Sequence, residues 1–393
     1  MIVSQNICAF VGQNENGILR DLSLSFMREA EPYGVKGHLV DFADADWAEK
    51  AAVAVREGLL FAFGFGGVGS GIDLGDKNYW DVVGVPFISM LADPPSWLPD
   101  RHNPGLPMVI LGYFFDEWLD IQRRFIKAPN LCARLPTCVP RNPHRDDIPW
   151  RQRGHRMVFV KTGESPAKRR ASWQQFPKRL REIMEDAANE ACSRETQGLT
   201  DLLLEVVDGH DLSLDGRTDI LFRLMYELDD YVRMERATRV VEALSHFPVE
   251  IIGRGWDHIN KQGAKATFLP AVPASSLARL TADTQFMVNT TQNIGSSVHE
   301  RVPLAFAAKT CSVSDRNAYS RTYFQEIPTF FGIDWHSPDL KDQVAAIWNS
   351  TEDYGECMEP AFQTAETVFA PLNLMFAAFE LAEVFRFGAQ LKA

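Results

Sequence analysis

The residues best suited to chemistry lie between Met287 and Asn317, in the run MVNTTQNIGSSVHERVPLAFAAKTCSVSDRN. Gly295, Ser296 and Ser297 interrupt this run just before apolar residues recur at helical spacing. A loop of small residues at the start of a helix offers free backbone N–H groups, which bind phosphate. The run therefore predicts a phosphate site formed by a strand, a loop and a helix. Capping of the helix by Ser296 or Ser297 is the alternative use of the same residues.

Polar side chains on either side of this loop supply further candidate ligands. Asn289 ends the apolar run that precedes the loop, and His299, Glu300 and Arg301 fall in the helical pattern that follows it. We expect His299 to donate a hydrogen bond to a phosphate oxygen or to the group that the phosphate carries, and Glu300 to accept one from a hydroxyl group. Arg301 is either a ligand or the anchor of an ion pair. In the simpler alternative, His299 is a satisfied structural residue and Glu300 only favours the positive end of the helix dipole.

A second charged group follows the apolar run Met157–Val160. The segment KTGESPAKRR at 161–170 places Lys161, Lys168 and Arg169 between a predicted strand and a predicted helix. Preorganised cations stabilise the negative charge that grows on a departing diphosphate. A helix end contributes about 0.3–1 kcal/mol when exposed and about 2 kcal/mol when partly buried, so at least one cation should be needed as well. The sequence does not rank the three cations, and a solvated charge run is the alternative for each.

A third motif, Gly253-Arg-Gly255-Trp256, follows the predicted strand Val249–Ile252. A flat nucleotide base needs a narrow slot, and glycines let the backbone come close to it. The indole of Trp256 offers a surface on which a base can stack. The alternative is that Trp256 anchors this loop in the core.

The run GSSVHERV at 295–302, followed by SDRN at 314–317, resembles the C-terminal domain of CgeB-like (spore-maturation-type) glycosyltransferases. The resemblance covers residues 230 to 320 and is vague elsewhere. It implies the two-domain GT-B fold and a nucleotide-diphosphate-sugar donor. It also implies that the cations of 161–170 face the donor diphosphate and that the turn at 253–256 lies near the nucleotide base.

Two positions depart from the pattern of that family. Many relatives carry a glutamate shortly after the Arg-Val pair and a glycine five residues beyond it, where this chain has Leu304 and Lys309. A ribose contact assigned to that glutamate cannot be carried over, which leaves Glu300 as the acid of this helix. The same departure raises the alternative of a protein that binds a nucleotide sugar without turning it over.

Apolar runs of strand length alternate with helical patterns in both halves of the chain. The runs are 2–11, 38–42, 59–65, 85–91 and 108–113 in the first half, and 157–160, 249–252, 267–270, 286–289 and 311–313 in the second. This alternation predicts βαβ units and parallel sheets, whose ligands bind beyond the carboxyl ends of the strands. We therefore predict an α/β fold with two Rossmann-like doubly wound domains that face a cleft, which is the GT-B plan.

Three segments are predicted from this pattern. Residues 1–150 form an acceptor-side domain, residues 151–370 form the donor-binding domain, and residues 371–393 form a C-terminal helix that crosses back to the first domain. Pro136–Arg153 is rich in proline and arginine and is expected to link the domains.

The mostly helical stretch 190–247 predicts a helical insertion in the second domain. Its apolar residues recur at the spacing of a core-facing helix. Arg233, Arg236 and Arg239 run along another side, where we expect solvent.

Asp93 is the candidate general base. It follows the apolar run Pro86–Leu91 and precedes two prolines, which places a carboxylate on a stiff turn at the carboxyl end of a strand. A reaction that inverts the sugar needs a base to deprotonate the acceptor hydroxyl. A turn-capping aspartate is the alternative, and Asp73, Asp76 and His102 are weaker rivals.

Two short motifs point elsewhere. Gly64–Gly69 fits GxGxxG, but the residues after it continue as a loop, whereas a dinucleotide site needs a helix to open at once. We expect a flexible loop there. Asp44 and Asp46 fit the metal-binding DxD pattern of another glycosyltransferase fold, but they precede a helix, which N-capping explains.

Composition limits the class of protein. The 393 residues suffice for two domains, and a net charge of −12 argues against nucleic acid as a bulk partner. The six cysteines form no CxxC pair, which predicts reduced thiols in a cytoplasmic protein without a metal site. The first ten residues do not resemble a signal peptide, and the best span candidate, Gly58–Ile72, falls short of the roughly 18 residues that a membrane span needs.

These observations favour a metal-independent glycosyltransferase that has a nucleotide-diphosphate sugar as co-substrate, no bound cofactor and an unidentified acceptor. A nucleotide-sugar epimerase of the same fold is an alternative, but it needs acid and base residues on both sides of a sugar carbon. The sequence offers a clear candidate for only one of these two residues. The non-catalytic binding protein and an NAD oxidoreductase complete the alternatives.

Overall fold

The computed structural model describes residues 5–12 and 17–390, and the chain divides into two compact units. Unit 1 comprises Met1–Pro140 and Val368–Ala393, and unit 2 comprises Arg141–Thr367. The sequence places the corresponding boundaries after residues 150 and 370. The segment 141–153, expected as a linker, is anchored in unit 2, because the buried guanidinium of Arg153 donates to the carbonyl of Thr284 at 2.9 Å and to Thr310 Oγ1 at 2.7 Å.

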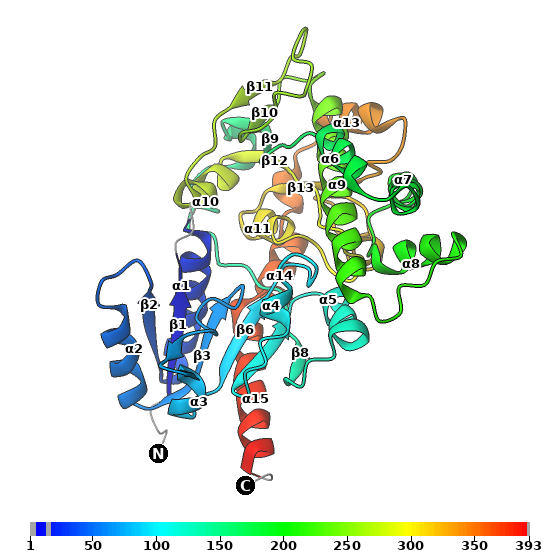
Figure 1. Cartoon of the computed structure of the whole chain (residues 1–393). Coiled ribbons are helices and arrows are strands. Elements are labelled where there is room, and N and C mark those ends of the chain that lie inside the picture. The colour runs from blue at the N-terminus through cyan, green and yellow to red at the C-terminus, as the bar shows by residue number, and fades with distance from the viewer. Residues whose placement is uncertain (1–4, 13–16, 391–393) are drawn as a thin grey trace. The chain divides into compact units, whose positions relative to one another are not determined.

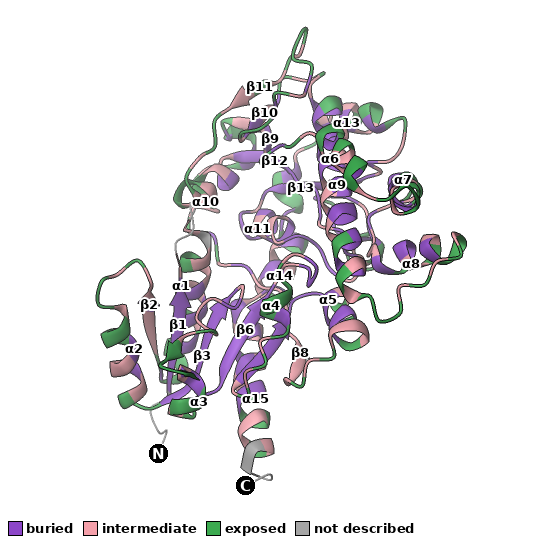
Figure 2. Ribbon diagram, viewed as in Figure 1, coloured by how far each residue is buried: buried purple, intermediate pink, exposed green. Residues whose placement is uncertain are grey.

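Unit 1 contains an all-parallel sheet in the order β2-β1-β3-β6-β7-β8 (Figure 1). Its strands are β1 (Gln5–Val11), β2 (Val35–Asp41), β3 (Leu59–Phe65), β6 (Phe87–Leu91), β7 (Val109–Tyr113) and β8 (Cys132–Arg134). Its α-helices are α1 (Ile18–Ala30), α2 (Trp47–Arg56), α3 (Tyr79–Val83), α4 (Pro99–His102), α5 (Asp116–Ile121) and α15 (Pro371–Gln390). Every residue of β3, β6 and β7 is buried (Figure 2), as expected for apolar runs in a sheet covered on both faces.

The C-terminal helix α15 packs in unit 1. Its buried face includes Leu374 and Ala378, and the ring of Phe379 lies 5.3 Å from that of Phe61. By length and composition alone, Tyr354–Gly388 is the one helical stretch of the described chain that is apolar enough to cross a membrane. The stretch is interrupted between α14 (Glu359–Thr367) and α15, and one face of α15 packs against α1.

Unit 2 contains a second all-parallel sheet, in the order β11-β10-β9-β12-β13-β14. Its strands are β9 (His155–Val160), β10 (Glu250–Ile252), β11 (Thr267–Leu269), β12 (Thr284–Val288), β13 (Cys311–Asp315) and β14 (Phe330–Ile333). After the insertion described next, its helices are α10 (Ala274–Ala282), α11 (Arg301–Ala307), α12 (Ala318–Tyr323), α13 (Leu340–Trp348) and α14. In chain order the strands read 3-2-1-4-5-6, which is the Rossmann order.

Four helices are inserted between β9 and β10. They are α6 (Pro166–Ser172), α7 (Lys178–Ala191), α8 (Thr200–Gly209) and α9 (Thr218–Leu244), and α6, α7 and α13 pack against α9 (Figure 1). Most of α9 is buried (Figure 2), including the charged residues Glu227, Asp229 and Arg236. The fold class predicted from the sequence is confirmed, with two Rossmann-like sheets, a helical insertion in the second and a C-terminal crossover helix.

The strand order locates the place where unit 2 would bind a ligand. The chain leaves β9 toward β10 on one side and reaches β12 on the other, so the order reverses between β9 and β12. Ligands of open α/β sheets bind beyond the carboxyl ends of the strands at such a reversal. The loops that follow β9 and β12 therefore flank the expected crevice, and these loops carry Lys161 and residues 289–300.

Candidate functional site

The loop after β12 is longer than the sequence predicts. Residues 289–300 form neither helix nor strand, and α11 begins only at Arg301. Glu300 occupies the N-cap position without a side-chain capping bond, so the alternative in which Ser296 or Ser297 caps this helix is wrong. Ser297 is buried, and its carbonyl accepts a 2.6 Å hydrogen bond from Asn317 Nδ2. This long-range bond draws the chain away from helical geometry at that point.

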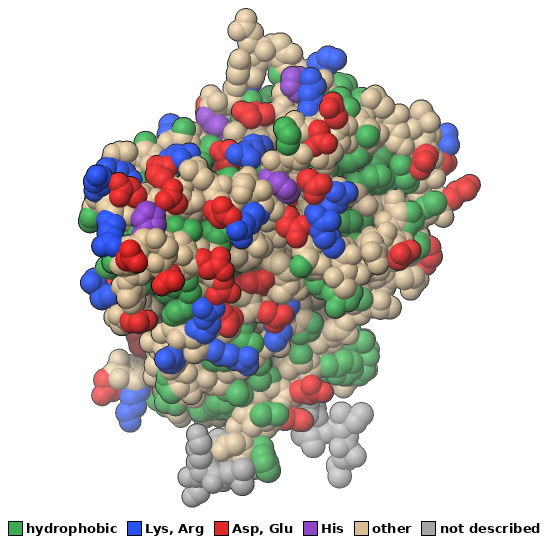
Figure 3. All heavy atoms as spheres, turned by 90° about the vertical axis from the view of Figure 1, so that its right-hand side faces the viewer, with side chains coloured by type: hydrophobic (Ala, Val, Ile, Leu, Met, Phe, Trp, Pro, Cys, Tyr) green, Lys and Arg blue, Asp and Glu red, His purple; other side chains and the backbone are tan. Residues whose placement is uncertain are grey.

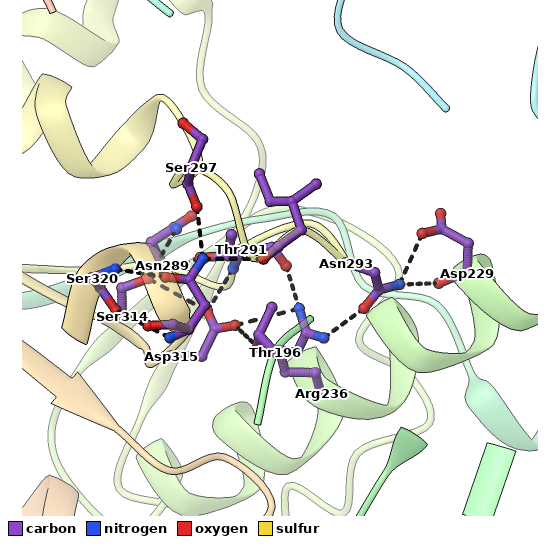
Figure 4. Close-up of polar contacts among 12 residues, drawn as sticks. Thr196, Asp229, Arg236, Asn289, Thr291, Asn293, Ser297, Ser314, Asp315 and Ser320 are labelled. Carbon is purple, nitrogen blue, oxygen red and sulfur yellow. Dashed lines mark hydrogen bonds and ion pairs between the residues drawn. The ribbon is translucent and has the colours of Figure 1, made fainter. Parts of the chain in front are cut away.

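A buried charge pair holds the loop in place. Asp315, at the end of β13, accepts a 2.6 Å bond from the backbone N–H of Thr291, and its carboxylate lies 3.4 Å from Arg236 Nη1. Arg236 also donates to the carbonyl of Thr291 and, at 2.6 Å, to Asn293 Oδ1 (Figure 4). Its guanidinium lies 4.9 Å from the centre of the Trp335 ring. The loop is thus ordered by side chains from α9 and β13.

The sequence analysis missed this role of Arg236. It expects Arg236 on a solvated face, but the side chain is 1% exposed. The residues one turn away on either side, Val232 and Val240, are both buried. This i±4 pattern was the available signal that Arg236 lies on a buried face of α9.

Asn289 follows β12 and takes part in the same packing. Its Nδ2 lies 3.3 Å from Ser314 Oγ, while its Oδ1 and the hydroxyl of Thr290 are buried without a hydrogen-bond partner. Gly295 is half-buried, and its carbonyl accepts a 2.9 Å bond from the backbone of Tyr319. Ser296 is also half-buried. The small-residue loop is therefore packed against α12 as well as against Asp315.

His299 and Glu300 form a close pair beside this loop. His299 Nδ1 lies 2.9 Å from Glu300 Oε2 and 3.3 Å from the backbone N–H of Arg301. Nδ1 must carry a proton to donate to the carboxylate of Glu300 and must lack one to accept from the N–H of Arg301. We assign the proton to Nδ1 because the contact with the carboxylate is shorter. In this tautomer, Nε2 of His299 is a hydrogen-bond acceptor.

The charges of this pair follow from the surroundings. Burial, with Arg301 and Lys161 nearby, lowers the pKa of His299 against the opposing effect of Glu300. Desolvation raises the pKa of Glu300, but His299, Arg301 and a backbone hydrogen bond outweigh it and lower that pKa to about 2. Near neutral pH, Glu300 is a carboxylate and His299 is an uncharged imidazole.

Lys161 lies at the centre of a group of cations. It directly follows β9, and its ammonium group makes no hydrogen bond or ion pair with the residues that the structure describes. Burial and the charges of Arg233, Arg301 and Arg236 lower the pKa of Lys161 to about 7, with Asp315 opposing. Burial is the largest of these causes, so the lowered pKa reports mainly the desolvation of the ammonium group, and an anion bound beside it would favour its charged form.

The other two candidate cations are placed differently. Lys168 is exposed on α6. Arg169 forms ion pairs with the buried carboxylate of Glu227, at 3.3 Å, and with Asp230. Arg301, in contrast, donates to the carbonyl of Val160, the last residue of β9. The geometry thus groups Lys161 with Arg301, while the charge of Arg169 is already matched.

The glycines of the 253–256 turn serve close packing of two loops. A Cβ at Gly253 would lie 2.0 Å from the carbonyl oxygen of Lys161, and one at Gly255 would lie 1.9 Å from that of Gly163. Trp256 is 3% exposed, and its Nε1 donates to the Lys161 carbonyl at 3.1 Å. These contacts favour the anchoring interpretation of Trp256, because a buried indole has no free face for a base. They also position Lys161.

Asp93 belongs to unit 1 and follows β6. It is half-buried, and the next residues form a turn in which the N–H of Trp97 donates to the carbonyl of Pro94 at 2.9 Å. The rival base His102 is 1% exposed and lies 3.1 Å from the hydroxyl of Tyr113. Burial and Arg101 lower the pKa of His102 to about 3, which suits a neutral structural group.

The two misleading motifs have structural explanations. After β3 the chain forms turns and the hairpin of β4 (Asp73–Leu74) and β5 (Lys77–Asn78), so no helix opens at Gly64–Gly69. Asp44 and Asp46 both pair with Lys50, at 2.8 and 2.9 Å. Within residues 5–12 and 17–390, no group of three or more His, Cys, Asp or Glu residues could hold a metal ion.

Residues 233–352 match a protein family described as "Glycosyl transferase-like". The matched segment includes Arg236, the loop after β12, and Asp315. Two solved structures share the whole architecture. An α-glucosyltransferase in complex with UDP-glucose and DNA containing an abasic site is 10% identical, with a TM-score of 0.56 over 97% of this chain and 100% of that one. A glycosyltransferase involved in avilamycin A biosynthesis is 11% identical, with a TM-score of 0.52 over 98% of each chain. No curated protein matches the sequence.

The fold is GT-B. These similarities, at 10% and 11% identity, show the architecture and not the reaction. The part of the chain between α9 and η5 (Tyr354–Cys357) is glycosyltransferase-like, and it is the part that carries the loop, His299 and Glu300.

Proposed function

We propose that this protein is a glycosyltransferase that moves a sugar from a nucleotide-diphosphate sugar to an acceptor. The observation that carries the proposal is the position of Lys161 at the reversal point of the unit 2 sheet, where Arg301 donates to the carbonyl of the preceding residue, Val160. The glycosyl transferase-like match of residues 233–352 and the GT-B fold support it. The narrower resemblance to CgeB-like enzymes stays a prediction.

The proposed chemistry uses fixed cations. Negative charge grows on the bridging oxygen of the diphosphate as the sugar bond breaks, and preorganised positive groups stabilise that charge best where water is excluded. Lys161 would contact the diphosphate and gain its proton as the anion binds, because a nearby opposite charge raises the pKa of an amine. Arg301 would hold the end of β9 and add positive potential. The proposal includes metal independence, because these cations would carry the charge that a divalent ion carries elsewhere.

His299 and Glu300 would act on the transferred sugar. With its proton on Nδ1 toward Glu300, the imidazole of His299 would accept a hydrogen bond at Nε2 from a sugar hydroxyl. The carboxylate of Glu300 would fix the orientation and tautomer of the ring. Asn289, Gly295, Ser296 and Ser297 would support this arrangement as parts of the packed loop. Asp93 stays the candidate general base from unit 1, with loss of kcat in Asp93→Asn as its test.

Titration of the full chain with UDP, GDP, dTDP and their glucose conjugates, in the presence and absence of EDTA, tests the proposal. We expect one nucleotide to bind by calorimetry, with unchanged affinity in EDTA, and Lys161→Met to weaken that binding. Absence of binding by every nucleotide, or an unchanged affinity in Lys161→Met, would contradict the proposal. Dependence on a divalent ion would contradict its metal-independent form.

A non-catalytic nucleotide-sugar-binding protein is the second candidate. Many CgeB-like relatives carry a glutamate where this chain has Leu304, which lies on α11 one turn beyond Glu300. Slow hydrolysis of the bound donor without acceptor would indicate an enzyme, whereas binding without any turnover would favour the second candidate. In either case we propose a cytoplasmic location, in agreement with the six free cysteines.

A further inference from the structure

A cavity of about 530 Å³ opens in unit 2, near the carboxyl ends of β13 and β14. Arg194, Glu195 and Gln197 line it from the connection between α7 and α8, Arg321 lines it from α12, and Asp334 lines it from the loop after β14. Its volume lies in the range of about 300–1,000 Å³ that is typical of small-molecule sites. Neither the charge group around Lys161 nor His299 belongs to its lining.

The charges around this cavity are balanced. Arg321 Nε donates to Glu195 Oε2 at 2.7 Å, and its Nη2 lies 3.8 Å from Asp334 Oδ1. Arg316 pairs with the other oxygen of Asp334 at 2.7 Å, and Arg194 pairs with Glu190. On the face drawn in Figure 3, acidic and basic side chains are likewise interspersed. The cavity therefore lacks the surplus of positive charge that surrounds Lys161 and that a phosphate would need.

The guanidinium and carboxylate groups that line the cavity can still donate and accept further hydrogen bonds. A guanidinium carries five N–H donors and a carboxylate about four acceptor positions, so the pairs described above leave several of each open. His336 Nδ1 and Asp334 Oδ1 have no hydrogen-bond partner among the residues that the structure describes, but both atoms are buried, so the open positions are those of Arg321, Gln197 and Glu195. Donors and acceptors thus lie side by side around a neutral space. A hydroxyl group both donates and accepts, so neighbouring hydroxyls on a ligand match this lining.

We propose that this cavity binds a neutral saccharide, as the part of a carbohydrate acceptor that lies away from the reacting hydroxyl. The proposal rests on the proposed function, and it names carbohydrate as the acceptor class. The cavity lies at the same edge of the unit 2 sheet as the loop after β12, because the strands are parallel. Its ligand is held by hydrogen bonds to Arg321, Gln197 and Glu195.

Both walls of the cavity are continuous with the charge pair that holds the loop after β12. Thr196, between two lining residues, donates its hydroxyl to Asp315 (Figure 4) and its backbone N–H to the carbonyl of Arg316 at 3.3 Å. Trp335 follows Asp334 in the opposite wall and packs under the guanidinium of Arg236. A saccharide in the cavity therefore sits against the elements that order the proposed donor loop.

The test uses the full chain and the neutral disaccharides maltose, cellobiose and lactose as probes, followed by saturation-transfer NMR and calorimetry. At least one probe should bind, and Arg321→Ala and Gln197→Ala should each weaken its binding by roughly tenfold, the effect of one lost hydrogen bond to a charged group. Arg321 is 53% exposed, so its removal should leave the fold intact, which thermal unfolding checks. Arg179→Ala, an exposed arginine on α7 outside the cavity, is the matched control and should bind as the wild type does.

Binding of none of the three probes, binding that Arg321→Ala and Gln197→Ala leave unchanged, or stronger binding of inorganic phosphate than of any disaccharide at this cavity would each overturn the proposal. A parallel titration with UDP separates this result from the proposed function. Normal UDP binding without disaccharide binding counts against the cavity alone. Disaccharide binding that responds to the cavity variants, without binding of any nucleotide, counts against the donor site and leaves the cavity as a saccharide site.

Discussion

Two glycine-containing loops follow parallel strands in this protein, and different forces hold them. The loop after β3 in unit 1 is held by bonds to its backbone, from Gly67 to Gly64 at 3.1 Å within its own turns, from the buried indole of Trp80 to Gly69 at 2.7 Å and from the exposed Arg101 to Gly66. The loop after β12 in unit 2 is held by Arg236 and Asp315, which come from other elements and are buried. The sequence of the first loop matches the GxGxxG pattern of dinucleotide-binding sites, whereas the cations Lys161 and Arg301 lie near the second loop.

This contrast separates two uses of small residues. Gly64 and Gly69 are required because a Cβ there would lie 1.9 Å from the Val68 carbonyl oxygen and 2.6 Å from Phe10 Cβ, respectively. These are steric needs of a tight turn and carry no information about a ligand. The positive potential around Lys161 arises from partly buried charged side chains, and such a potential is the physical basis of anion binding. The spacing of glycines is therefore a weaker guide to a site than the placement of charge.

Removal of the guanidinium that orders each loop tests this contrast, with the largest expected effect. Arg236→Ala should lower the free energy of unfolding by about 3–5 kcal/mol, because Asp315 would stay buried without its charged partner. Arg101→Ala should cost about 1 kcal/mol or less, because Arg101 is exposed and donates to one carbonyl, that of Gly66. Urea unfolding measures the free energy of unfolding of both variants. An equal decrease in the two variants would show that both loops depend on a charged side chain to the same extent.

The second test concerns the cation itself. Lys161→Met should weaken UDP binding by about 1.5–3 kcal/mol, or roughly 10–100-fold, because a hydrogen bond to a charged phosphate is lost. Lys168→Met is the matched control, because Lys168 is exposed on α6, and it should leave the affinity within roughly twofold. Calorimetric titration measures both, and a larger effect at Lys168 would move the proposed diphosphate site to α6.

The third test uses pH. Since the pKa of Lys161 is about 7, its amine is largely neutral above that pH in the free protein, and UDP binding should restore the proton. UDP affinity should fall by up to about tenfold per pH unit from about pH 7.5 to about 8.5, a window that lies above the titration of the UDP phosphates and below that of the uracil ring. In the absence of ligand, the unfolded state retains this proton up to its ordinary pKa, so Lys161 makes stability rise with pH over the same window.

Calorimetry in buffers of different ionisation enthalpy counts the protons taken up. Lys161→Met should remove both the proton uptake and this decline in affinity. A decline that persists in Lys161→Met would assign the titration to another group.

The smallest effect is expected in the loop after β3. Gly66 has a φ of 65°, so Gly66→Ala should cost about 1–2 kcal/mol through left-handed backbone strain. UDP affinity should be unchanged, because this loop has no role in the proposed donor site. A loss of UDP affinity in a folded Gly66→Ala protein would join the two loops in one function and remove the contrast between them.

The fold was predictable because its signals are local. The run Leu59–Phe65 forms a fully buried strand, and apolar runs of this kind, separated by helical patterns, are sufficient to indicate parallel sheets. The start of α11 was predicted too early, because the buried side chain of Asn317 takes the carbonyl of Ser297 from twenty residues away. A helix boundary that depends on such a bond leaves no mark in its own sequence window.

The candidate site was predictable in part. Arg301 was chosen for its place in the helical run after the small-residue loop and Lys161 for its position after a strand, and the structure brings both to the reversal point of the sheet. Arg169 was chosen on the same grounds, but Glu227 and Asp230, some sixty residues later in α9, match its charge. Whether a cation is free or paired depends on partners that only packing brings near.

The amino-acid sequence by itself determined the two α/β halves, the helical insertion and the position of the polar loop, because periodicity and strand length are properties of short segments. Tertiary structure alone decided that Arg236 is buried against Asp315, that Trp256 anchors a turn, and that the charges of Arg233 and Arg301 converge on Lys161. Electrostatic potential sums over groups that are distant along the chain, so the lowered pKa of Lys161 exists only once the sheet and α9 have assembled.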